Sequence, residues 1–91
     1  MKLAWANKAL SDLERLHNLL APTNRQASDQ ALLALAKASS VLLTNPRVGE
    51  QLFQFEPCEV RRLLTAQYEI RYEIQGETVY VLRLWHARED R

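Results

Sequence analysis

The sequence VLRLWHAREDR, residues 81–91, brings together the side chains of this chain that are best suited to chemistry. The imidazole of His86 can accept or donate a proton near neutral pH. Arg88 follows shortly after it, and a guanidinium group binds phosphate or carboxylate while keeping its own proton. These residue types suit an RNA-cleaving site, a surface that binds another protein, or a solvated tail, and the remainder of the sequence has to distinguish them.

From residue 61 onward the chain contains arginines but no lysine, whereas all the lysines lie in its first half. These arginines are Arg61, Arg62, Arg71, Arg83, Arg88 and Arg91. Carboxylates are mixed among them, and the formal net charge of the chain is only +1. Because such a mixed field holds a nucleic-acid backbone weakly, we expect no direct nucleic-acid specificity. Planar guanidinium groups also favour carboxylate and aromatic partners.

The length of 91 residues and a hydrophobic content of 47% predict a single folded domain, residues 1–91, with one modest core. No apolar run approaches the roughly 20 residues of a membrane-spanning helix, and the start MKLAWANK lacks the apolar stretch of a signal peptide. Cys58 is the single cysteine, and no Cys/His cluster has zinc spacing. We therefore expect a cytoplasmic protein with no membrane contact, no disulfide, no metal and no cofactor.

The first half of the sequence predicts a strand followed by two helices. The large apolar residues Leu3 and Trp5 alternate with Lys2 and Ala4, and Asn7 can cap a following helix. Four leucines then recur at helical spacing, Leu10, Leu13, Leu16 and Leu20. Asp12 and Arg15 fall between them and are expected to face outward. A second helix carries a stripe rich in small residues, which favours an antiparallel helical hairpin: Ala27, Ala31, Leu35, Ala38 and Leu42.

The second half has the two-residue period of strands. Residues 52–55 and 60–65 are short extended segments, and residues 68–74 alternate strictly, with Glu69, Arg71 and Glu73 expected on a solvated outward face. Residues 79–85 are apolar except for Arg83, as in a strand covered on both faces. The sequence therefore predicts an α+β fold of order β-α-α-β-β-β, in which an N-terminal strand and an antiparallel helical hairpin pack on a twisted antiparallel sheet.

Four stretches in this order resemble the RelE/ParE superfamily of bacterial toxins, and the ParE branch most: LAWANKALSDLERL, NPRVGEQL, VRRLLTAQYEIRYEI and VLRLWHAREDR. Together they span nearly the whole chain. The resemblance implies the toxin of a type II toxin–antitoxin system and one of two functions on the same fold. RelE-like members cut messenger RNA in the ribosomal A site, whereas ParE-like members inhibit DNA gyrase.

The motif on the penultimate strand favours the second function. RelE-like toxins carry Tyr-Arg-apolar-apolar-Tyr there, with an arginine that binds phosphate, but residues 68–72 of this chain are YEIRY. The carboxylate of Glu69 would repel a phosphate group. The preceding strand offers arginines where RelE-like toxins have lysines. Ala87 follows His86 where a histidine-containing subgroup of these ribonucleases has a tyrosine.

The resemblance thus implies a gyrase inhibitor that acts by stoichiometric binding, not as an enzyme, and that a cognate antitoxin neutralises. In this family a disordered antitoxin segment folds on the toxin, adding a helix against the hairpin and a strand along the sheet edge. Two alternatives stay open: a ribosome-dependent mRNA endoribonuclease of the RelE type that uses His86 and Arg88, and a non-toxic member that only binds its antitoxin. A homodimer and a complex of two toxins with two antitoxins are both open as well.

The candidate residues for binding the target are Arg61, Arg71, Arg83, His86, Arg88 and Arg91. The candidates for binding the antitoxin are Leu13, Leu16, Leu20, Leu35 and Trp85. Several have a purely structural alternative. Arg83 inside an apolar strand needs an ionic partner, Glu69 or another carboxylate. His86 can instead cap the last strand, and Trp85 can belong to the core.

Overall fold

The computed structural model describes residues 1–20, 25–65, 67–87 and 89, without the side chains of residue 20 and residues 25–28. Its elements are β1 (Lys2–Trp5), α1 (Asn7–Leu20), α2 (Arg25–Thr44), β2 (Glu50–Gln51), the short 3-10 helix η1 (Phe53–Phe55), β3 (Glu59–Thr65), β4 (Tyr68–Gln75) and β5 (Thr78–His86). This order confirms the predicted α+β arrangement and adds the short strand β2. Neither of the helices described is long and apolar enough to cross a membrane.

The extended segment predicted at residues 52–55 is wrong, because the chain forms η1 there. The backbone N–H groups of Phe55 and Glu56 donate to the carbonyls of Leu52 and Phe53 and do not pair with a neighbouring strand. The extended pairing lies just before this turn, in β2, which pairs with Arg61 and Arg62 of β3.

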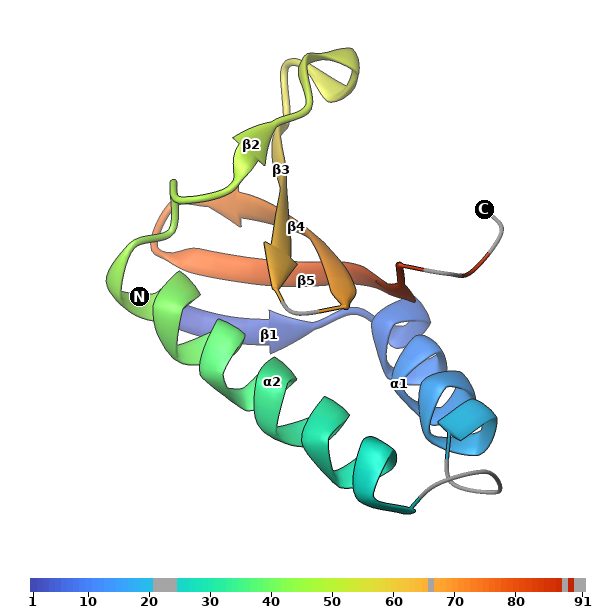
Figure 1. Ribbon diagram of the computed structural model, residues 1–91. Helices are drawn as coiled ribbons and strands as arrows, with labels where there is room; N and C mark the ends of the chain where they lie inside the picture. Colours follow the sequence, from blue (N-terminus) through green and yellow to red (C-terminus); the bar gives the residue numbers. More distant parts are fainter. Residues whose placement is uncertain (21–24, 66, 88, 90–91) are drawn as a thin grey trace.

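All strands belong to one sheet with the order β1-β5-β4-β3-β2. Strands β2 to β5 pair antiparallel, but β1 pairs with β5 in parallel, so the sheet is mixed where an antiparallel sheet was predicted. A parallel neighbour needs a long connection, and the helices with the later strands provide it. The sheet is strongly twisted, so that β3 crosses the direction of β5 (Figure 1), and a bulge between Arg71 and Tyr72 contributes to the twist.

The two faces of the sheet differ because successive residues of a strand point to opposite sides. One face packs against α1 and α2 and forms the core with Tyr68, Ile70, Tyr72, Ile74, Val79, Val81 and Leu84. We call it the helix face. The other face, called the arginine face, carries the cross-strand pairs Glu69 with Trp85 and Arg71 with Arg83.

The two helices form the predicted hairpin, which covers the helix face (Figure 1). The predicted stripe of α2 is confirmed for its described side chains, since Ala31, Leu35, Ala38 and Leu42 are all buried in the core. The helices are not close along their whole length. They diverge toward the C-terminal end of α2 (Figure 1), where α2 packs on the core through Ala38 and Leu42.

Tyr72 fixes the segment between α2 and β2 to the sheet. Its hydroxyl donates to Pro46 O at 2.7 Å and accepts from Gly49 N at 3.0 Å. Burial raises the pKa of Tyr72 above its ordinary value, in spite of the hydrogen bond from Gly49. Gly49 lies so close to β3 and β4 that a Cβ atom there would be 2.6 Å from Arg62 O and from the Tyr72 hydroxyl.

We expect Gly49→Ala to lower the free energy of unfolding by about 2 kcal/mol, because the added methyl group forces backbone or a buried side chain to shift. Urea unfolding at neutral pH measures this change. Val48→Ala, at an exposed neighbouring position, is the control and should stay within about 0.5 kcal/mol of the unmodified protein. A Gly49→Ala protein of unchanged stability would contradict the close approach.

Candidate functional site

Two side chains of α1 take the place of a neighbouring strand at the edge of β5. Backbone pairing on this edge extends to the hydrogen bond from Ala6 N to Val81 O, at 2.9 Å. Further along β5, Leu84 N donates to Asp12 Oδ2 at 2.9 Å, and Arg15 Nη2 donates to Leu84 O at 3.0 Å. The helix thereby satisfies backbone groups that a strand edge would otherwise leave unpaired.

Asp12 is a buried carboxylate with several partners. It is only 3% exposed, it accepts hydrogen bonds from Arg83 Nε at 2.7 Å and Arg83 Nη2 at 3.2 Å, and it pairs with Arg15. Burial disfavours the charged form, but the hydrogen bonds from Arg83, Leu84 N and Arg15 outweigh this effect and lower the pKa of Asp12 below its ordinary value of 3.8. Arg83 therefore has the carboxylate partner that the sequence predicts, and this partner is Asp12.

The prediction that Asp12 faces outward is wrong. Ala9, Asp12 and Leu16 follow one another at about one helical turn, and all three are buried where α1 packs on β5. The carboxylate is tolerated on this side because it accepts from two groups of β5: the N–H of Leu84, which β1 does not reach, and the guanidinium of Arg83.

Arg15 extends the charged network to the residue that follows β5. Its Nε and Nη2 donate to the carboxylate of Glu89 at 3.0 and 3.1 Å, and Glu89 Oε1 accepts from His86 N at 2.8 Å. Burial disfavours the charged form of Glu89, but the bonds from His86 N and Arg15 lower its pKa below the ordinary value. Charge pairs thus hold the end of β5 against α1.

On the arginine face, guanidinium groups and aromatic rings lie against one another. Arg83 Cζ lies 4.9 Å from the centroid of the Trp85 ring, and Arg71 Cζ lies 4.8 Å from the same centroid and 5.2 Å from that of Phe55. Contacts of this kind contribute about 0.5–1 kcal/mol when exposed and more when desolvated. We call the series Asp12, Arg83, Trp85, Arg71 and Phe55 the arginine stack.

The arginine stack borders a cleft of about 380 Å³, lined by Ala6, Asn7, Lys8, Phe55, Arg71, Leu82 and Arg83. Among these described residues there are three cationic side chains and no carboxylate. Helix α1 begins at Asn7, so the partial positive charge of its N-terminal end lies on the same cleft. This arginine cleft suits an anionic group that has an apolar neighbour.

The solvated outward face predicted for β4 is also wrong. Glu69 is only 2% exposed, since Trp85 lies opposite it on β5 and Arg62 Nη1 approaches Glu69 Oε1 to 3.9 Å. Arg71 is partly buried as well. The face is covered because large side chains of neighbouring strands lie over it, and a two-residue period cannot reveal this covering.

His86 lies on the helix face, away from the arginine cleft. Its ring meets Tyr68 edge-on with centroids 5.3 Å apart, and its Nε2 lies 3.1 Å from Gln67 Oε1. The residue is only 8% exposed. Because Trp85 precedes it on the strand and points to the other side, the sheet separates the imidazole from the guanidinium groups of the cleft. This placement agrees with the structural alternative for His86.

Arg61, another candidate target-binding residue, does not line the cleft. Arg61 pairs with Glu59 at 2.9 Å and donates to Gly49 O at 2.8 Å, so it supports the segment before β2. Arg88 and Arg91 lie outside the described residues, and their role stays a prediction. Within the described part of the chain, no three His, Cys, Asp or Glu side chains are grouped so that they could hold a metal ion.

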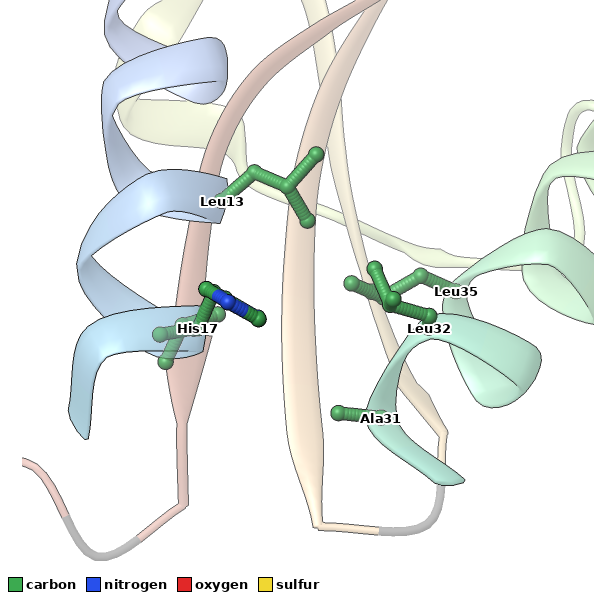
Figure 2. A pocket seen from close by; sticks show the side chains of 6 residues that line it. Leu13, His17, Ala31, Leu32 and Leu35 are labelled. Carbon is green, nitrogen blue, oxygen red and sulfur yellow. The ribbon is translucent and has the colours of Figure 1, made fainter. Parts of the chain in front are cut away.

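A small apolar hollow between the helices contains several candidate antitoxin-binding residues. It is lined by Leu13, Leu16, His17, Ala31, Leu32 and Leu35 (Figure 2). Leu16 and Leu35 are buried, whereas Leu32 is 46% exposed. A partner at this surface would therefore meet Leu32 directly and the two buried leucines at most at the floor of the hollow.

Of the two remaining antitoxin candidates, Trp85 does not line this hollow. The side chain of Leu20 lies outside the described residues. Trp85 belongs to the arginine stack on the opposite face of the sheet. The set predicted as one antitoxin surface is thus divided between two faces, and its binding role stays a prediction.

Comparisons with solved structures place this arrangement among bacterial toxin folds. The chain is similar to a chain of the "Chromosomal ParDE TA system from P. aeruginosa", with a TM-score of 0.76, 19% identity and coverage of 97% of each chain. It is also similar to the isolated E. coli RelE toxin, with a TM-score of 0.61, 20% identity, and coverage of 98% of this chain and 86% of that one. At these identities the likeness establishes the RelE/ParE-like fold, as predicted.

The family comparison is more specific. Residues 3–91 match the family described as "ParE toxin of type II toxin-antitoxin system, parDE". A comparison with curated proteins gave no match. Because the family match spans nearly the whole chain, this chain belongs to the ParE toxin family, and this membership implies an antitoxin partner. The predicted ParE branch is confirmed.

We expect Asp12→Asn to lower the free energy of unfolding at neutral pH by about 2–3 kcal/mol, because it removes the charge that Arg83 and Arg15 face. The folded-state pKa of Asp12 is lowered, so its contribution is present above the unfolded value, about 3.9, and is lost as the pH falls through the folded value. Urea unfolding from neutral pH down to about pH 3 should show the difference between variant and unmodified protein shrinking below about pH 4.

Glu14→Gln on the exposed side of α1 is the matched control and should change stability little at either pH. An Asp12→Asn difference that stayed constant across this acid range would contradict a charged Asp12 as the source of the stability.

Proposed function

We propose that this ParE-family toxin binds DNA gyrase directly in the cytoplasm and inhibits it stoichiometrically, without turnover of a substrate. Excess toxin then arrests growth. We further propose that the antitoxin neutralises it by folding a disordered segment onto the toxin surface. Membership in the ParE family supports the choice of gyrase over messenger RNA as the target.

The position of His86 carries this proposal. Cleavage of RNA by attack of the 2′-hydroxyl needs a base and cations around the same phosphate group. Here the imidazole packs on Tyr68 on the helix face, while Arg71 and Arg83 line a cleft on the arginine face. A single phosphate cannot contact the imidazole of His86 and the guanidinium groups of Arg71 and Arg83 at once in this arrangement, which favours binding over catalysis.

The toxin should block gyrase supercoiling of relaxed plasmid DNA at concentrations comparable to that of the gyrase, because a stoichiometric inhibitor acts by occupancy. The same preparation should leave messenger RNA intact in a translation extract. Gel assays of plasmid topology and of transcript length, run side by side, measure both outcomes. Boiled toxin is the control for both assays.

Two results would contradict the gyrase proposal, and each supports a different alternative. Ribosome-dependent cleavage with normal supercoiling, abolished in a His86→Ala, Arg88→Ala double variant, would support the RelE-type nuclease. Unimpeded bacterial growth during good expression of the folded toxin would support a member that only binds its antitoxin.

The hollow between α1 and α2 is the surface that we propose for a helical part of the antitoxin segment. The two helices expose several leucines, Leu10, Leu19, Leu32 and Leu33. An amphipathic helix binds such a surface by laying its apolar side into the groove between two helices. Burial of Leu32 by the partner would complete the apolar floor that Leu16 and Leu35 already form.

We expect Leu32→Glu to weaken binding of the antitoxin about tenfold or more, because complex formation would bury an unpaired carboxylate. Calorimetric titration with the antitoxin encoded by the adjoining gene measures the affinity. Val41→Glu is the matched control, since Val41 is exposed on the same helix but lies about two and a half turns from Leu32, on the opposite side. Equal affinities of the two variants would contradict this docking surface.

A further inference from the structure

The guanidinium of Arg71 is held in place by aromatic rings but has no ionic partner among the residues that the structure describes. It contacts the rings of Phe55 and Trp85, and its Nε is buried with no hydrogen-bond partner among the described residues. A buried donor without an acceptor is unfavourable, and more so when the group is charged. By contrast, Arg83 on the neighbouring strand has Asp12, and Arg62 has Glu50.

The charges around the cleft favour an anion at this position. Lys8, Arg71 and Arg83 line the cleft, and its lining residues include no carboxylate. The charge of Arg83 is largely balanced by Asp12, so Lys8 and Arg71 provide the excess. The N-terminal end of α1 adds partial positive charge, and its first turn has no acidic residue. The site therefore has an excess of positive charge and a guanidinium that is already oriented.

The anion is better matched by one carboxylate than by a nucleic-acid backbone. Glu69 and Glu73 lie on either side of Arg71 along the same face of β4, so the positive region is confined to one position. A phosphate backbone needs a row of cations along its path. The apolar walls that Phe55 and Leu82 add to the cleft suit the side chain of a neighbouring apolar residue.

We propose that the arginine cleft binds one aspartate or glutamate of the antitoxin, flanked by an apolar residue, with Arg71 donating the hydrogen bonds to its carboxylate. This inference rests on the proposed function for its partner, because the antitoxin is the partner that family membership itself implies. The contact lies on the face opposite the helical hollow, so the antitoxin segment passes around the sheet and occupies both surfaces. Arg71 then acts as a specificity residue for an acidic side chain.

The test compares toxin variants in calorimetric titrations with the antitoxin encoded by the adjoining gene. Arg71→Met keeps the length that packs on the two rings but removes the charge, and we expect about tenfold weaker binding or more. Arg71→Lys keeps the charge without the planar fork and should fall in between. Arg62→Met is the control, because Arg62 pairs directly across from Arg71 in the sheet and is already paired with Glu50.

Two further measurements keep the result independent of folding. Circular dichroism must show the variants folded, and the Arg71 Nε–H resonance of the unmodified toxin, assigned by its absence in Arg71→Met, should move on complex formation. Replacing each antitoxin carboxylate by its amide should then identify one position whose loss is not additive with Arg71→Met.

Unchanged affinity of folded Arg71→Met, or an unmoved Nε–H resonance, would overturn this inference while leaving the antitoxin complex and the proposed function in place. Weaker gyrase inhibition with unchanged antitoxin affinity would assign the cleft to the target and would also overturn it. If the unmodified toxin formed no complex with the antitoxin, the partner in the proposed function would be wrong and the inference would fail with it.

Discussion

The carboxylate of Asp12 is the interaction on which the arrangement of this toxin depends. It occupies the edge of β5 where β1 has ended, and it accepts from the backbone of Leu84 and from the guanidinium of Arg83. An isolated buried carboxylate would be strongly unfavourable, but here both an unpaired edge group and a strand arginine need an acceptor. Asp12 therefore closes the sheet edge together with Arg15, orients the first arginine of the stack and holds the helix at this edge.

The two faces of the sheet present different chemistry, because successive strand residues point to opposite sides, and the position of α1 affects both of them. On the helix face, α1 and α2 leave an apolar hollow whose floor is formed by core leucines. On the arginine face, Arg83 lies over the Trp85 ring, and the same ring contacts Arg71 beside the cleft. Displacement of α1 would remove one side of the hollow and the partner of Arg83 together, so both candidate surfaces depend on the same helix position.

Local periodicity in the sequence was enough to predict α2, β4 and the side of each that faces the core, because the burial of those residues follows directly from the period of the element. A continuous apolar run was enough to predict β5. Neither pattern was enough for Asp12 or Glu69. Asp12 pairs with a residue 71 positions away, and Glu69 is covered by side chains of other strands, so no local pattern indicates their burial. The one usable signal was Arg83, a charge within an apolar strand, which indicated an ionic partner without identifying it. Lys8, Phe55 and Leu82 carried no such signal, because the cleft forms only where the start of α1, η1 and β5 meet.

The same separation of faces decides how the charged residues can act. Guanidinium groups do not exchange protons near neutral pH, so Arg71 and Arg83 can hold an anion but cannot transfer a proton to it. The imidazole that could do so lies across the sheet, against Tyr68 and Gln67. The rings of Phe55 and Trp85 restrict the side chain of Arg71. Arg71 therefore loses less conformational entropy when it binds a ligand, which favours affinity for a single, well-placed carboxylate. Among the described residues, the chemistry of the arginine face is therefore that of recognition, and this is the chemistry that the proposed contact with an antitoxin carboxylate requires.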